Sequence, residues 1–179
     1  LPAGQSRMLY PYNGTVFPRG LPAPVLQWEG GMADAVYVRA RSMLFEYEGC
    51  FSGTELTSLA IPQAAWDKAA EQSLGAGDPL SVELSFISGG SGQRLAKLSL
   101  VFALATLKAA VYYNTYGSLL ATQQGILGGV IMRLIPGQAA PQVFLSSPSP
   151  THCVGCHSVS ADGSRMVAEL HVQPGTVED

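Results

Sequence analysis

The chain has 179 residues, of which 47% are hydrophobic and only 13% charged, and its net charge is −3. This composition can bury a core, which argues against a disordered chain, and the length suits one generous domain or a domain with an appendage. The ten basic residues are scattered from Arg7 to Arg165, so no basic face for nucleic acid is predicted. The longest apolar run in the region 95–113, Leu100 to Ala105, is far shorter than the roughly 20 residues of a membrane span.

Alternating apolar and polar residues predict β-strands over much of residues 1–107. Between Tyr10 and Gly20, proline, glycine and asparagine indicate a loop. In the clearest strand, Val82, Leu84 and Phe86 would share the buried face. The strands expected in this region lie at 25–28, 35–41, 43–49, 81–86 and 98–104.

The last two of these strands are joined by Ser88–Gly92, whose glycines indicate a hairpin turn. No helix follows these glycines, so they do not match a dinucleotide-binding fingerprint. One helix is expected between Pro62 and Leu74, because proline suits a first helical turn and Gly75 suits a C-terminal stop. Trp66, Ala70 and Leu74 recur every four residues and would face the sheet.

Two short stretches, Leu26–Glu29 and Ala33–Val38, resemble the second and third strands of fibronectin type III and related immunoglobulin-like domains. The resemblance implies an immunoglobulin-like β-sandwich over residues 1–107, in a chain whose fold class is mainly β. The helix near Trp66 departs from that pattern, since such domains usually carry a loop or a strand there.

From Lys108 the pattern changes to short strand candidates, followed by a Ser/Pro-rich linker at Ser146–Pro150. We expect residues 108–150 to hold short strands and this linker, and residues 151–179 to form a loop-rich segment with a hairpin. These pieces are too few to close a second core, so they either pack on the sandwich or begin a domain that continues beyond Asp179. The strands expected in this region lie at 110–113, 130–135, 143–145 and 165–172.

The residues Cys153-Val154-Gly155-Cys156-His157 form a complete C-x-x-C-H motif, which is typical of covalent haem attachment. Two thiols three positions apart on one helical turn would reach the two vinyl groups of one haem. His157 would then lie beneath the iron as its proximal ligand. The motif therefore predicts one haem c, bound through Cys153 and Cys156.

The same side chains could serve instead as a redox dithiol, a disulfide or part of a zinc site. A redox dithiol would follow a β-strand and begin a helix, whereas a Ser/Pro linker precedes this motif. A disulfide between Cys153 and Cys156 is similarly weakly indicated. A structural zinc ion would need a fourth ligand from Cys50 or His171, and such sites usually bring a second spaced pair. Cys50 itself is expected to be a buried apolar thiol.

The sixth iron ligand is the least determined part of this hypothesis. Met166 begins the strand that returns after Asp162-Gly163 and is the leading candidate, with His171 close behind it. Met132, a partner chain or an open site stay as alternatives. His152 lies too near Cys153 to cross to the other face of the same haem.

The segment Ser158–Val167 resembles the S-x-D-G signature of TolB-type β-propeller blades, which in some secreted bacterial proteins directly follows C-x-x-C-H. Asp162-Gly163 would make a tight turn there. Together with the haem motif, the chain resembles a c-type cytochrome. That resemblance implies electron transfer in the periplasm or outside the cell, with a redox protein partner or within a larger redox assembly, and no catalysis by the chain itself.

Two other functions stay open: a peroxidase-like haem enzyme, with His152 or His171 as acid–base group, and a binding or adhesion module with a zinc site. Haem c attachment implies export, yet Leu1–Gly4 has neither the basic start nor the apolar stretch of a signal peptide. We therefore expect the chain as given to be mature or trimmed.

Overall fold

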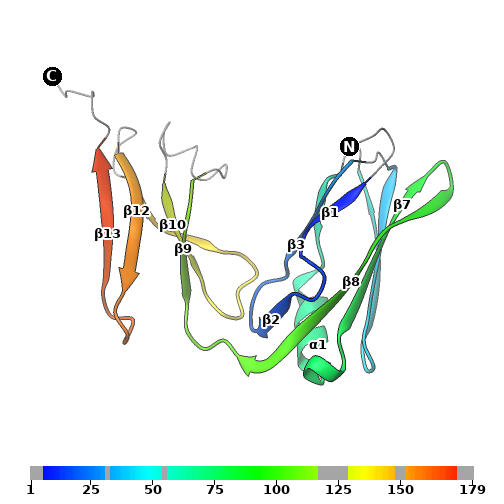
Figure 1. Ribbon diagram of the computed structural model, residues 1–179, viewed down its shortest axis with the longest axis horizontal. Coiled ribbons are helices and arrows are strands. Elements are labelled where there is room, and N and C mark those ends of the chain that lie inside the picture. Colours follow the sequence, from blue (N-terminus) through cyan, green and yellow to red (C-terminus); the bar gives the residue numbers. More distant parts are fainter. Residues whose placement is uncertain (1–5, 31–32, 54–55, 117–128, 148–151, 173–179) are drawn as a thin grey trace. The chain divides into compact units, whose positions relative to one another are not determined.

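The computed structural model describes residues 6–30, 33–53, 56–116, 129–147 and 152–172 of the chain. The described part is mainly β, as predicted, with one α-helix and one short 3-10 helix among its strands (Figure 1). The chain divides into two compact units, Leu1–Lys108 and Ala109–Asp179, which are described separately below.

The first unit contains two β-sheets. One has five strands in the order β2-β8-β7-β4-β5, in which β2 and β8 are parallel and the other neighbours are antiparallel. The other is antiparallel and has the order β1-β3-β6. The strand bounds are β1 Arg7–Tyr10, β2 Val16–Arg19, β3 Val25–Glu29, β4 Ala35–Arg41, β5 Glu46–Ser52, β6 Ser58–Ala60, β7 Leu80–Ser88 and β8 Ser91–Thr106.

Both sheets contribute side chains to one buried hydrophobic cluster. Because side chains alternate between the two faces of a strand, β4 and β7 each bury every second residue, among them Val38 and Leu84. From the other sheet, β3 buries Leu26 and Trp28. The rings of Trp28 and Phe86 lie 6.0 Å apart, so the two sheets meet in this cluster.

Helix α1, Gln63–Gln72, follows Pro62 as expected and ends at Ser73. Its buried Trp66 packs edge-on against Phe17, with ring centroids 5.2 Å apart, and lies 4.7 Å from the ring of Phe102. The prediction that Leu74 faces the sheet was wrong. Leu74 lies just past the helix end, before the 3-10 turn η1 (Gly75–Gly77), and its side chain is 55% exposed.

Three further expectations for this unit are corrected. The stretch Tyr10–Gly20 is not all loop, because β2 pairs in parallel with β8, a long-range contact that local composition does not reveal. The strand expected at 43–49 begins only at Glu46, since the Ser42 N–H donates to the Phe45 carbonyl in a turn. Cys50 is exposed and not buried, because on β5 it alternates with the half-buried Gly49 and Phe51.

The second unit contains an antiparallel sheet in the order β11-β10-β9 and a separate antiparallel hairpin of β12 and β13. Val130, Ile131 and Met132 on β10 are buried. Of the expected linker, Ser146 ends β11, whereas Pro148–Pro150 lie outside the described residues. The bounds are β9 Val111–Thr115, β10 Val130–Leu134, β11 Gln142–Ser146, β12 His152–Val159 and β13 Met166–Val172.

None of the helices in the described ranges is long and apolar enough to cross a membrane.

Candidate functional site

The C-x-x-C-H motif lies on strand β12, so the expectation of a helical turn at these residues was wrong. The strand forms because its backbone pairs with β13 along almost its whole length. The pairing steps from Gly155, opposite Glu169, to His157, opposite Ala168. Cys156 is the extra residue of this β-bulge, and its φ of 35° is in the left-handed region that non-glycine residues seldom adopt.

This bulge decides which face of the hairpin each ligand candidate occupies. Residues directly opposite one another share a face, so Cys153 shares a face with His171, and His157 shares one with Ala168. Ala168 and His171 are three positions apart on β13, which places them on opposite faces. Met166, two residues before Ala168, lies on the face of His157. Cys153 and His157 therefore point to opposite faces of the hairpin.

A side chain from β9 holds the imidazole of His157. The Nδ1 atom of His157 lies 2.6 Å from Oδ1 of Asn114, and the Nδ2 group of Asn114 donates to the Val154 carbonyl oxygen at 3.2 Å. Because a carbonyl only accepts, the amide nitrogen of Asn114 must face Val154, and its oxygen must face His157. Nδ1 is then the donor, and in the neutral ring Nε2 keeps its lone pair.

Two glycines allow the motif strand to be approached closely. Gly129, which is buried just before β10, leaves room for the Val154 carbonyl oxygen, with which an added Cβ would overlap. That Cβ would also lie 3.0 Å from Sγ of Cys153. On Gly155 an added Cβ would lie 3.0 Å from the hydroxyl oxygen of Tyr116. Gly129 thus lies against the motif strand at Cys153 and Val154, and Tyr116 lies against it at Gly155.

The hydroxyl of Tyr116 lies in the electrostatic field of the motif. Burial raises the pKa of Tyr116, and the negative charge of the Cys153 and Cys156 side chains in their thiolate form raises it further, while a hydrogen bond from the Cys156 backbone lowers it. Tyr116 therefore stays a neutral phenol at physiological pH.

The turn between β12 and β13 is built around Asp162. Its carboxylate accepts hydrogen bonds from the Ser160 hydroxyl at 2.6 Å and from the Ser164 hydroxyl at 2.7 Å. The Ser160 bond, followed by those from Ser164, lowers the pKa of Asp162 to about 2. Gly163 has a φ of 71°, which a glycine adopts without strain. The tight turn expected at Asp162-Gly163 is therefore present.

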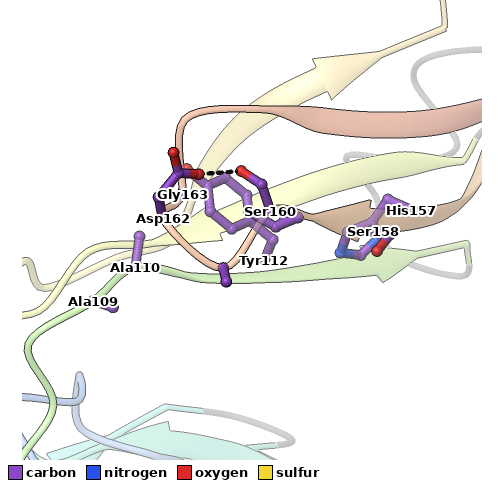
Figure 2. A pocket seen from close by; sticks show the side chains of 10 residues that line it. Ala109, Ala110, Tyr112, His157, Ser158, Ser160, Asp162 and Gly163 are labelled. Atoms are coloured by element: carbon purple, nitrogen blue, oxygen red, sulfur yellow. Dashed lines mark hydrogen bonds between the residues drawn. The ribbon is translucent and has the colours of Figure 1, made fainter.

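A hollow of about 630 Å³ opens beside His157, a volume within the usual range of small-molecule sites. Figure 2 shows Asp162 and Ser160 at one end of it, joined by their hydrogen bond, and His157 with Ser158 at the other. Its walls come from the start of β9 and from the end of β12 with the following turn. The lining residues are Ala109, Ala110, Tyr112 and residues 157–163.

The remaining candidate ligands are spread over different environments. Cys153 is half-buried and Cys156 exposed, and both thiols are free. Met132 is buried in β10, Met166 is half-buried and His171 is exposed. Within the part of the chain that the structure describes, no three His, Cys, Asp or Glu side chains come together as a metal site.

Asn114, Tyr116 and Gly129 are site residues that sequence reasoning missed. No motif marks them, since each acts only because β9 and β10 lie against β12, which the sequence does not reveal. Comparison with protein-family models, with curated proteins and with solved structures finds no match for this chain.

Proposed function

We propose that the chain is a single-haem c-type cytochrome that transfers electrons in the periplasm or outside the cell. The observation that carries this proposal is the complete attachment motif, with both thiols free and Cys156 exposed. Bound haem would supply the one-electron chemistry, while the chain supplies ligation, burial and hydrogen bonds that set its potential.

The state of His157 supports a role as iron ligand. A metal-binding histidine typically donates its second ring N–H to an oxygen, which fixes the ring and leaves the other nitrogen for the metal. Asn114 Oδ1 accepts from Nδ1 in that manner, and Nε2 is the nitrogen left to bind. The hollow beside His157 offers space on the same unit of the chain.

The strand register sets a condition on this proposal. Both thioether bonds and the His157 ligand must engage one haem, yet Cys153 points to the face opposite His157. We therefore expect attachment to change the backbone between Cys153 and Cys156. The bulge is the natural place for that change, because Cys156 already lacks a partner in the ladder and has a left-handed φ.

For the sixth ligand, Met166 stays the leading candidate over His171. Met166 shares the face of His157, whereas His171 shares the face of Cys153. A methionine ligand would raise the reduction potential relative to a second histidine.

The first unit is proposed to be an immunoglobulin-like sandwich that docks a redox partner or spaces the haem unit within a larger assembly. Its support is the strand order, with β1-β3-β6 in one sheet and β2-β8-β7-β4-β5 in the other, over one shared cluster of buried side chains. Such sandwiches commonly hold partners and carry no chemistry themselves.

The test is to produce the full chain with a signal peptide in a bacterium that matures c-type cytochromes, and to stain denaturing gels for haem. The wild type should carry haem, the Cys153→Ala/Cys156→Ala double variant should not, and Cys50→Ala should carry as much as the wild type. His157→Ala should alter the low-spin spectrum. Equal haem staining of the double variant and the wild type would contradict covalent attachment.

A further inference from the structure

Asn114 lies outside the C-x-x-C-H motif, and its hydrogen bonds determine which ring nitrogen of His157 is free to bind a metal. We propose that Asn114 is a positioning residue that fixes His157 in the Nδ1–H form before any cofactor is attached, so that Nε2 is the single ligand atom presented. The consequence for haem binding rests on the proposed function, whereas the state of the ring does not.

The first step is the orientation of the Asn114 amide, which the Val154 carbonyl decides. An amide has one end that donates and one that only accepts. The 3.2 Å contact from Nδ2 to the Val154 oxygen fixes the donating end, so the 2.6 Å contact to His157 is made by the accepting end. Nδ1 of His157 must therefore carry its proton.

The second step is that this form is not the one a free histidine prefers. A neutral histidine side chain in water favours the proton on Nε2, which would leave Nε2 unable to bind a metal. Asn114 reverses that preference by accepting from Nδ1. Because Asn114 lies within β9 and its backbone pairs with Ile131 of β10, the acceptor is held by a sheet and not by a loop.

The third step is that Asn114 acts on His157 from outside the hairpin. Its side chain contacts β12 at two points, the Val154 carbonyl and the His157 ring, and so ties the motif strand to β9. In known metal sites, loss of such an outer hydrogen bond typically weakens metal binding by about 10- to 100-fold. We expect a loss of that size for haem.

The experiment measures the ring directly, by nitrogen-15 NMR of His157 in the haem-free full-length Cys153→Ala/Cys156→Ala chain. The background should show the Nδ1–H form. Asn114→Leu should shift the population toward Nε2–H, and Asn114→Asp, which keeps an accepting oxygen, should retain Nδ1–H. Gln142→Leu, the same amide-to-leucine change at an exposed position on β11 of the same sheet, is the matched control and should leave the ring unchanged.

A second readout is the titration of haem into the same proteins, followed by absorption. Asn114→Leu should bind about 10- to 100-fold more weakly than the background, and Gln142→Leu should bind as tightly as the background. A His157 ring in the Nε2–H form with Asn114 present, or Nδ1–H retained in Asn114→Leu, would overturn the proposal. Should the wild-type chain take up no haem during maturation, the proposed function fails, while the NMR result still decides the role of Asn114.

Discussion

The two units of this chain differ in how many of their apolar side chains they bury. In residues 1–108, both sheets and helix α1 contribute side chains to one buried cluster. In residues 109–179, the buried hydrophobic residues that the structure describes are Val130, Ile131, Met132 and Val154. Several other apolar side chains of that unit are exposed. They include Val143, Phe144 and Leu145 on β11 and Val167 and Leu170 on β13.

The difference in buried apolar surface indicates how each unit is stabilised. Burial of apolar area is the main favourable term in folding, so the first unit has the means to fold by its own core. The second unit buries much less in the described residues and leaves strands with apolar surface. We therefore expect the second unit to be less stable than the first without haem, and bound haem would add apolar contacts to it.

The strongest test of this difference in stability is to produce the two units as separate polypeptides. A polypeptide of residues 1–108 should fold cooperatively without haem, because it contains the whole cluster around Trp28 and Trp66. Haem-free residues 109–179 should unfold at a lower temperature than this piece. Circular dichroism during thermal unfolding checks both pieces. An unfolded 1–108 piece, or a haem-free 109–179 piece that unfolds at the same or a higher temperature, would contradict the comparison.

A large effect is also expected from one side chain of the first core. Trp66→Ala should destabilise the first unit by about 3–5 kcal/mol, because it removes a buried ring that packs on Phe17 and Phe102. Leu74→Ala, at an exposed position after the same helix, should change stability by less than about 0.5 kcal/mol. Denaturant unfolding measures both, and similar losses for the two variants would show that α1 does not pack through Trp66.

In the second unit, Gly129→Ala should cost about 1–3 kcal/mol, since its Cβ would overlap the Val154 carbonyl oxygen of the motif strand. Gly155→Ala meets only the hydroxyl end of the Tyr116 side chain, which can move, so its cost should be smaller. Unfolding of the haem-loaded chain, followed at the haem absorption band, compares the two. A neutral Gly129→Ala would mean that β12 does not lie against this residue.

The smallest effect on stability is expected for a substitution of Asp162, in the turn between β12 and β13. Hydrogen bonds from Ser160 and Ser164 lower the pKa of Asp162 to about 2 from its ordinary value of 3.8. A lowered folded-state pKa contributes stability above pH 4, and that contribution is lost as the pH falls toward 2. The stability difference between wild type and Asp162→Asn should therefore be constant above pH 4 and shrink below it. A difference that does not change between pH 5 and pH 2 would exclude this role.

The sequence predicted those parts of the fold that depend on local pattern. Strict alternation located β4 and β7, and Pro62 with Gly75 bracketed α1, because each signal comes from neighbouring residues. β2 was missed because its strand state depends on β8, more than 80 residues away in sequence. The bulge at Cys156 was missed for the same reason, since only pairing with β13 creates it.

The candidate site shows the same distinction between features set by neighbouring residues and features set by long-range contacts. The motif residues Cys153, Cys156 and His157 lie within five consecutive positions, so the motif itself is visible in the sequence. Asn114 was not, because its role arises from the approach of β9 to β12. Cys50 was misplaced because alternation gives two faces without saying which one is buried.

The central claim is that one haem is covalently bound through the C-x-x-C-H motif. The most direct measurement is the intact mass of the denatured chain, purified after export and maturation and then extracted with acid acetone. The account predicts the polypeptide mass plus one haem, with the colour retained in the protein fraction. A mass equal to that of the polypeptide alone, with any haem passing into the acetone, would contradict it.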